Sequence, residues 1–243
     1  MGQLDGKIAI ITGAGTGIGK GIARAFAREG ATLVIASRNE SNLQRTADEL
    51  RPHGATVEVV PTDVSEESTV VALFEHTMRR FDRLDILVNN AGVFDGGPLE
   101  ELTLAAWQRV MDVNLTGVFL CTREAMKIMK HQRGGRIINI GSISAQVPRM
   151  NSAPYSTTKH GLVGLTKSTA LEGRAFGIAA SCRHPGNVVT ERRSGSEADM
   201  DQEPMMSADD IAMAVLTMAA LPPYVNMLES VVLPVTQLYL GRG

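Results

Sequence analysis

Short apolar runs and longer amphipathic segments alternate along the 243-residue chain. The apolar runs, typical of buried strands, cover residues 8–11, 32–36, 57–61, 84–88, 136–140, 178–181 and 230–235. The segments typical of helices cover residues 19–29, 41–50, 66–81, 104–131, 153–176 and 208–221. Strands of a parallel sheet are buried on both faces, and a right-handed helical crossover joins each to the next. The pattern therefore predicts an α/β, doubly wound Rossmann fold, with a seven-stranded, mostly parallel sheet and helices on both faces.

A polar stretch interrupts this alternation near the C-terminal end. Residues 191–206 are rich in charge and contain Gly195 and Pro204, which is typical of a surface loop. The chain length suits one large α/β domain. We therefore expect residues 1–243 to form a single domain, with residues 191–206 as a surface loop.

Composition narrows the possible partners. The chain is 44% apolar and 21% charged, with a formal net charge of −2, as in an ordinary soluble enzyme. Without a basic excess we expect no nucleic acid as partner, and we also expect no membrane. Cys121 and Cys182 lie in apolar stretches, which indicates reduced core thiols instead of a disulfide or a metal site. These thiols and the lack of a signal-peptide pattern favour the cytoplasm.

A glycine-rich loop follows the first predicted strand and runs into a helix. It reads Thr12-Gly13-Ala14-Gly15-Thr16-Gly17-Ile18-Gly19. Glycines here allow backbone N–H groups to approach a pyrophosphate at the positive end of a helix. A glycine-rich string can serve merely to turn the chain, but a strand before it and a helix after it favour a dinucleotide site. A nucleoside-triphosphatase loop is excluded because Gly21, not Ser or Thr, follows Lys20.

Three further motifs follow in order. They are Asn89-Asn90-Ala91-Gly92, Tyr155-Ser156-Thr157-Thr158-Lys159, and Pro185-Gly186-Asn187-Val188-Val189-Thr190. With the loop spacing Thr-Gly-x-x-x-Gly-x-Gly, the chain resembles the short-chain dehydrogenase/reductase family over nearly its whole length. The resemblance implies an oxidoreductase that transfers a hydride between a nicotinamide cofactor and a carbonyl or secondary alcohol. It also implies that the single domain of residues 1–243 both binds the dinucleotide and carries the chemistry, with residues 191–206 as a lid over the substrate.

The resemblance also implies a set of cofactor-binding residues. They are Gly13, Gly15, Thr16, Gly17, Ile18, Gly19, Ser37, Arg38, Asp63, Val64, Asn90, Ala91, Gly92, Tyr155, Lys159, Pro185, Gly186, Val188 and Thr190. Asp63 and Val64 match the family's adenine-contacting pair, although Asp63 could equally be an acidic N-cap of the following helix.

The end of the second strand indicates which nicotinamide binds. The acidic residue that usually binds the adenosine ribose is replaced by Ser37-Arg38. Arg38 can stack on adenine and donate to a 2′-phosphate, so we predict NADP(H) in preference to NAD(H). Two observations temper this preference. Arg38 could be a solvated loop charge, and Thr16 stands where many NADP-dependent relatives carry a second basic residue.

Tyr155 and Lys159 are the centre of the predicted chemistry. Four residues apart on a helix, they project from one face about one turn apart. The lysine ammonium would stabilise the tyrosinate. The resemblance implies that Tyr155 is the general acid/base, that Lys159 also holds the nicotinamide ribose, and that Ser142 bonds the substrate oxygen. It further implies that Asn114 supports a water-linked proton path. Each residue alone has an ordinary structural explanation, but their joint occurrence in order argues against coincidence.

The resemblance also suggests where the substrate and a second subunit would contact the chain. We expect Phe94, Ser144, Gln146 and Asn187 to contact the substrate, and we expect no metal. Arg149, Arg192 or Arg193 could meet a carboxylate, but simple solvation of these arginines is the favoured interpretation. The family commonly forms dimers or tetramers through the two long helices, here 104–131 and 153–176, so we expect a homo-oligomer, with a homotetramer favoured over a dimer. The family's Val-Asp-Gly-Gly closing strand is missing, which leaves the role of residues 226–237 open.

Two alternative functions can be compared with this prediction on the same sequence features. A non-catalytic NADP(H)-binding redox sensor would share the fold, although the intact Tyr155, Lys159 and Ser142 argue against it. A sugar-nucleotide epimerase of the extended branch would need a longer chain and a different glycine spacing. The sequence fixes neither the substrate nor the direction of the reaction, because one fold hosts many specificities.

Overall fold

The computed structural model describes residues 1–191 and 204–239. Across these residues seven strands form one sheet in the order β3-β2-β1-β4-β5-β6-β7, and every neighbouring pair is parallel. The strands are β1 (Ile8–Thr12), β2 (Thr32–Ser37), β3 (Val57–Pro61), β4 (Ile86–Asn89), β5 (Gly135–Ile140), β6 (Ile178–Pro185) and β7 (Glu229–Val232). The predicted doubly wound fold is confirmed, and the described sheet is entirely parallel.

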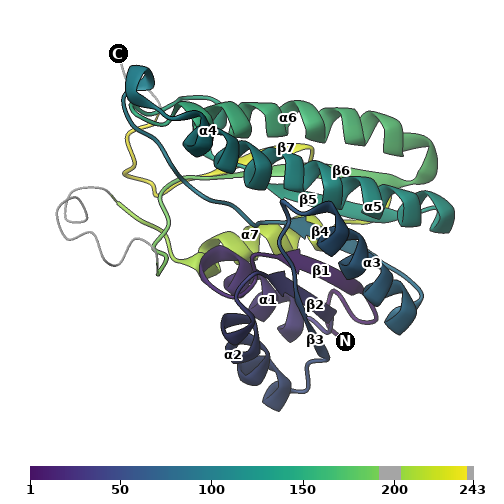
Figure 1. The fold of residues 1–243 in the computed structure, drawn as a ribbon. Coiled ribbons are helices and arrows are strands. Elements are labelled where there is room, and N and C mark those ends of the chain that lie inside the picture. The colour runs from purple at the N-terminus through teal and green to yellow at the C-terminus, as the bar shows by residue number, and fades with distance from the viewer. Residues whose placement is uncertain (192–203, 240–243) are drawn as a thin grey trace.

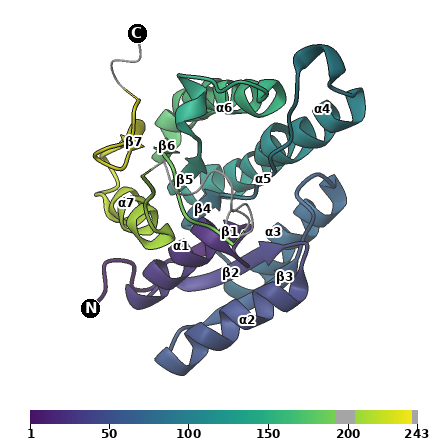
Figure 2. The same cartoon turned by 90° about the vertical axis from the view of Figure 1, so that its left-hand side faces the viewer.

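Helices cover both faces of this sheet (Figures 1 and 2). One layer holds α1 (Gly17–Arg28), α2 (Glu40–Leu50) and α7 (Ala208–Ala220). The other holds α3 (Glu67–Phe81), α4 (Leu104–Met111), α5 (Gly117–Gln132) and α6 (Ala153–Gly173). Short 3-10 turns lie at Arg51–His53, Leu99–Glu101, Ile143–Ala145 and Arg174–Phe176.

The core divides into layers as the strand alternation requires. Ile11 of β1 packs with Ile22 and Phe26 of α1, whereas its neighbour Ile10 packs into the opposite layer with Leu73 of α3. All five side chains are fully buried. Two continuous apolar layers thus hold the central strands rigidly, and the loops at the strand ends are positioned by them.

The strand order creates the place for a ligand. The chain runs outward from β1 to β2 and β3, then returns to place β4 on the other side of β1. In open parallel sheets, ligands bind at the carboxyl ends of the strands beside such a reversal. The loops that follow β1, β4, β5 and β6 all emerge at this edge, and they carry the motifs found in the sequence.

Two local features differ from expectation, and a third predicted segment lies mostly outside the described residues. The segment 104–131 is interrupted by a π-helical turn at Asp112–Thr116, which separates α4 from α5. The final strand covers only Glu229–Val232. Most of the expected lid, residues 192–203, lies outside the described residues, while buried Met206 at its end forms a parallel bridge with Val188. No helix within residues 1–191 and 204–239 is long and apolar enough to cross a membrane.

Candidate active site

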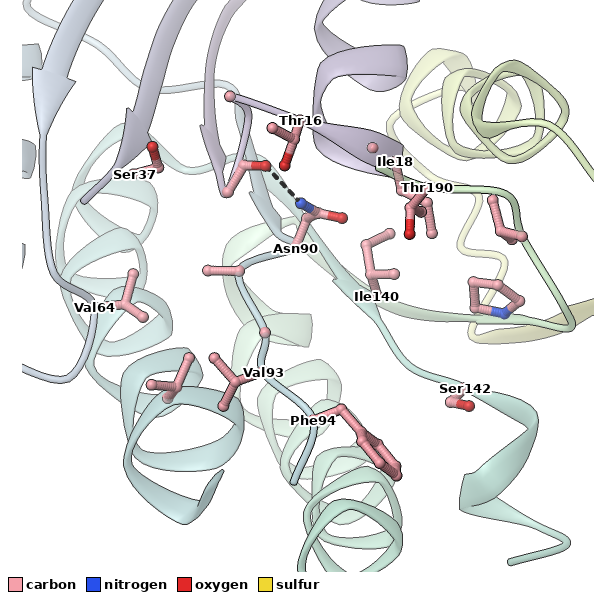
Figure 3. Close-up of a pocket in the computed structure, with 18 of the residues that line it drawn as sticks. Thr16, Ile18, Ser37, Val64, Asn90, Val93, Phe94, Ile140, Ser142 and Thr190 are labelled. Atoms are coloured by element: carbon pink, nitrogen blue, oxygen red, sulfur yellow. Dashed lines mark hydrogen bonds between the residues drawn. The ribbon is translucent and has the colours of Figure 1, made fainter. Parts of the chain in front are cut away.

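A cleft of about 430 Å³ crosses the carboxyl edge of the sheet (Figure 3). The predicted residues that line it are Gly13, Gly15, Thr16, Gly17, Ile18, Ser37, Arg38, Asp63, Val64, Asn90, Ala91, Gly92, Phe94, Ser142, Tyr155, Lys159, Pro185, Gly186, Val188 and Thr190. Figure 3 shows Ser37 and Val64 at one end and Phe94 and Ser142 at the other. The remaining predicted residues, Gly19, Asn114, Ser144, Gln146 and Asn187, are not part of the lining.

The glycine loop is held in place by the loop that follows β4. Thr12 Oγ1 accepts hydrogen bonds from the N–H groups of Asn90 (3.0 Å) and Ala91 (3.1 Å). The Asn90 side-chain amide donates in return to the carbonyl of Gly13 over 3.2 Å (Figure 3). Thr12 was absent from the residues predicted for the site, although it opens the motif. Its hydroxyl explains why a threonine stands there.

The N-terminus of α1 already holds an anion. The N–H of Gly17, the first residue of α1, donates to Glu191 Oε2 over 2.8 Å. Gly17 has φ = +53°, a backbone conformation that favours glycine. Because helix N-termini attract negative charge, the Glu191 carboxylate shows that this loop suits a phosphate. The residues of the loop therefore fit the pyrophosphate of a dinucleotide.

At the far end of the cleft, Arg38 projects into solvent. Its side chain is 62% exposed, and its Nη1 atom lies 3.9 Å from Asp63 Oδ2. Asp63 Oδ1 accepts hydrogen bonds from the N–H (3.0 Å) and hydroxyl (2.6 Å) of Ser65. Asp63 therefore closes the turn before α3 and is not its N-cap, which is Glu66. Asn39 and Asn42 also line this end and were not anticipated.

Tyr155 and Lys159 lie together on the first turns of α6. The Lys159 ammonium is 5.5 Å from the centre of the Tyr155 ring and donates to the carbonyl of Ile140 over 2.8 Å. The Phe94 ring packs on Tyr155 with centroids 5.3 Å apart and a 59° tilt. The lysine is buried, so its charge is held at one place beneath the phenol ring.

Ser142 follows β5 at the same edge of the sheet. It begins the 3-10 turn Ile143–Ala145, and its Oγ accepts a hydrogen bond from the N–H of Ser144 over 3.1 Å. The backbone of Ser144 thus orients the Ser142 hydroxyl. Both residues are buried, and only Ser142 lines the cleft.

Asn114 sits in the π-helical turn between α4 and α5. Its side chain donates to the carbonyl of Val93 (2.8 Å), accepts from the N–H of Val93 (2.8 Å), and reaches Thr158 Oγ1 (3.5 Å). π turns inside helices are frequent at functional sites. Here the turn directs a buried amide to the loop after β4 and to the helix that carries Tyr155.

Gln146 and Asn187 are engaged by other parts of the chain. Asn187 Oδ1 accepts from Arg149 (2.7 Å), and its backbone N–H donates to Gln237 Oε1 (3.0 Å). Gln146 accepts a hydrogen bond from the hydroxyl of Tyr239. The C-terminal segment, whose role the sequence left open, therefore braces the loops at the end of the cleft that holds Ser142 and Tyr155. Arg192 and Arg193 lie outside the described residues.

The two cysteines are free and buried. Burial raises the pKa of the Cys121 thiol to about 12 and that of Cys182 to about 11. A thiol that stays protonated is a poor nucleophile and a poor metal ligand. Among the residues that the structure describes, no group of three or more His, Cys, Asp or Glu side chains is placed to hold a metal ion.

Known proteins similar to this chain are short-chain dehydrogenases and reductases. The profile of the short chain dehydrogenase family matches residues 7–201. Over 195 residues the chain is 40% identical to cis-4-hydroxycyclohexanecarboxylate dehydrogenase from Sinomonas cyclohexanicum, covering 80% of this chain and 78% of the relative.

Solved structures show the same likeness. A 3-ketoacyl-(acyl-carrier-protein) reductase from Brucella melitensis complexed with NADH superposes with a TM-score of 0.87 at 32% identity, covering 95% of this chain and 98% of the other. A variant of actinorhodin polyketide ketoreductase with NADPH gives a TM-score of 0.88 at 31% identity, covering 96% and 98%. Structural neighbours therefore hold either nicotinamide.

Proposed function

This chain belongs to the short-chain dehydrogenase/reductase family and is an oxidoreductase. We propose that it transfers a hydride between NADP(H) and a carbonyl or secondary alcohol, with Tyr155 as general acid/base. One observation carries the proposal. Tyr155, Lys159 and Ser142, from α6 and the end of β5, line the same cleft as the glycine loop after β1. A bound dinucleotide and a small substrate can therefore meet at one place.

The proton chemistry follows from this arrangement. The bound nicotinamide supplies or accepts the hydride. During reduction, the Tyr155 hydroxyl gives its proton to the substrate oxygen, which the Ser142 hydroxyl holds by a hydrogen bond. During oxidation, the Tyr155 oxygen takes that proton back. The Lys159 ammonium, 5.5 Å from the ring centre, stabilises the tyrosinate and binds the nicotinamide ribose.

The preference for NADP(H) rests on the end of β2. The strand ends in Ser37 and Arg38 and has no acidic residue there to repel a 2′-phosphate. The Arg38 guanidinium is only loosely paired with Asp63, at 3.9 Å. An exposed guanidinium at this distance is free to turn toward a 2′-phosphate and form bidentate hydrogen bonds. Steady-state kinetics with both cofactors test the preference. A lower kcat/KM with NADPH than with NADH contradicts it.

Assembly and location complete the proposal. Apolar side chains protrude from the helices expected at the family interface, namely Leu104 of α4, Phe119 of α5 and Leu171 of α6. Burial of these side chains against a second copy of the chain would fit a dimer or tetramer built on these helices. The two free buried thiols fit a cytoplasmic protein.

The catalytic role of Tyr155 is tested with a substrate panel. Ketones, aldehydes, ketoacids, sugars and quinones are assayed for NADPH oxidation at neutral pH, and the best substrate is used for Tyr155→Phe. Loss of the proton donor should lower kcat by a factor of about 10² to 10⁴, while the Kd for NADPH, measured by fluorescence titration, stays near the wild-type value. Tyr224→Phe, which changes a tyrosine 90% exposed, is the matched control.

Each outcome of this experiment decides between functions. Near-wild-type turnover by Tyr155→Phe refutes the role of the tyrosine. NADPH binding without turnover on any member of the panel favours the redox-sensor function.

A further inference from the structure

One fully buried histidine has no part in the proposed chemistry, yet it lies against the catalytic serine. The His184 Nδ1 atom is 2.9 Å from the carbonyl oxygen of Ser142 and 3.3 Å from its backbone nitrogen. On the other side of the ring, Nε2 is 3.1 Å from Glu229 Oε1. The imidazole therefore connects the backbone of Ser142 to a carboxylate on the last strand.

The strand register explains how the two residues meet. In the parallel pair of β6 and β7, Glu229 is opposite Cys182, and His184 lies two residues further along β6. Residues two apart on a strand share a face, so Glu229 and His184 are diagonal neighbours. A Cβ atom at position 141 would lie 2.6 Å from His184 Nδ1. Gly141 thus allows the ring to approach the end of β5, where Ser142 begins.

Charged groups surround this contact. Glu229 also has Lys167 at 3.6 Å and receives a hydrogen bond from Gln146 over 3.4 Å. Burial lowers the pKa of His184, and the nearby Lys159 charge acts in the same direction, while the Ser142 carbonyl and Glu229 oppose it. A neutral ring can carry its proton on Nε2, facing the carboxylate, or on Nδ1, donating to the carbonyl of Ser142.

The buried Nε2 atom of His184 has Glu229 as its nearby carboxylate. This atom is buried, and it has no aligned hydrogen bond in the structure although Glu229 Oε1 is 3.1 Å away. A buried polar atom without a partner costs free energy, and a small movement of the Glu229 side chain would satisfy it. Glu229, with its side chain 29% exposed, therefore provides the adjustable half of the contact.

We propose that Glu229 and His184 are positioning residues that fix Ser142, so that the C-terminal strand takes part in catalysis. The inference rests on the proposed role of the Ser142 hydroxyl in holding the substrate oxygen. In either tautomer one hydrogen bond joins His184 Nδ1 to the Ser142 backbone: Nδ1 accepts from the Ser142 N–H when the ring proton is on Nε2, and it donates to the Ser142 carbonyl when the proton is on Nδ1. This backbone contact helps to define where the Ser142 hydroxyl lies. A displacement of about 1 Å in such a group can reduce turnover by about 10²-fold, although the substituted residue never touches the substrate.

The experiment measures coupling between these residues and Ser142. His184→Ala and Glu229→Ala should each lower kcat by about tenfold to a hundredfold, with a smaller effect for the partly exposed Glu229. In a Ser142→Ala background, both losses should disappear, because residues that act through one group are not additive. His184→Asn, which keeps a polar group near the Nδ1 position, should recover part of the lost turnover.

A second histidine–glutamate pair provides the control. His76 Nε2 lies 3.5 Å from Glu58 Oε2, where α3 meets β3, away from the cleft lining. His76→Ala and Glu58→Ala should leave kcat near wild type. The unfolding midpoint and the Kd for NADPH are measured for every variant. Glu229→Ala keeps the proposal falsifiable if His184→Ala fails to fold.

The outcomes separate this inference from the function on which it rests. Unchanged turnover in Ser142→Ala contradicts the proposed role of Ser142, and the positioning role falls with it. A large loss in Ser142→Ala, with the His184 and Glu229 losses persisting at full size in that background, contradicts only the positioning role. In that case the two residues support the fold and not the serine.

Discussion

The end of the cleft that follows β1 and β2 is made largely of backbone, whereas the end that follows β5 and β6 is made of side chains from distant elements. At the first end, the N–H of Gly17 binds an anion, and the Thr12 hydroxyl and the Asn90 side-chain amide hold the loop by bonding main-chain N–H and C=O groups. At the second end, Tyr155 and Lys159 come from α6 and are positioned by contacts with other loops and strands.

This difference teaches what each end can select. Backbone donors recognise the phosphates common to all dinucleotides, so the first end needs a side chain such as Arg38 to tell one nicotinamide cofactor from another. Under the proposed function the second end carries the proton transfer, which depends on placing a hydroxyl and an ammonium within a fraction of an ångström. Substitutions should therefore change cofactor choice at one end and turnover at the other.

The largest effect in this comparison is expected for Lys159→Met. The substitution removes the charge that the proposed function assigns to stabilising the tyrosinate, and it leaves the carbonyl of Ile140 without its 2.8 Å donor. We expect kcat to fall by about 10² to 10⁴-fold, while the ratio of kcat/KM between NADPH and NADH stays within about twofold of wild type. Steady-state kinetics with both cofactors measure this.

A matched control for Lys159→Met lies on α5. Lys127 is 63% exposed and pairs with Glu124, so Lys127→Met should leave both kcat and cofactor choice unchanged. A Lys159→Met variant with wild-type kcat would show that the catalytic end does not depend on this ammonium.

An intermediate effect is expected for Arg38→Ala. Charge-assisted hydrogen bonds to phosphate are worth about 1.5–3 kcal/mol, but the exposure of Arg38 places its contribution at the lower end. We expect kcat/KM for NADPH to fall by about tenfold and that for NADH to change little. The control is Arg79→Ala, because Arg79 is also an exposed arginine but lies on α3, away from the cleft. An equal loss of kcat/KM with both cofactors would show that Arg38 does not determine the preference for NADPH.

The sequence predicts most of the first end because its parts are local. A buried strand, a glycine loop and a helix lie within residues 8–28, so the pattern and the motif are read together. The alternation of strands and helices likewise predicts the doubly wound sheet. The π-helical turn at Asp112–Thr116 could not be predicted, because one added residue barely alters a helical pattern of apolar positions.

The second end depends on contacts that the sequence hides. Gln146 bonds Tyr239 across 93 residues, and Asn187 bonds Gln237 across 50. The approach of Glu229 to His184 depends on the register of β6 and β7, which a short edge strand leaves open in the sequence. Motif matching therefore locates Tyr155 and Lys159, while the residues that brace the loops at the second end emerge only from the folded chain.

The smallest effect is expected where the two ends meet, at Glu191. Its carboxylate accepts the Gly17 N–H at the anion-binding end of α1, so it competes with a pyrophosphate for this donor and repels the phosphates. An anion at a helix N-terminus is stabilised by about 0.3–1 kcal/mol, so Glu191→Gln should lower the Kd for NADPH by about two- to fivefold. Fluorescence titration measures the Kd, and Glu75→Gln, at a carboxylate 63% exposed on α3, controls for the lost charge. A higher Kd in Glu191→Gln would mean that this carboxylate supports the bound cofactor, and the backbone end would then depend on a side chain from the loop after β6.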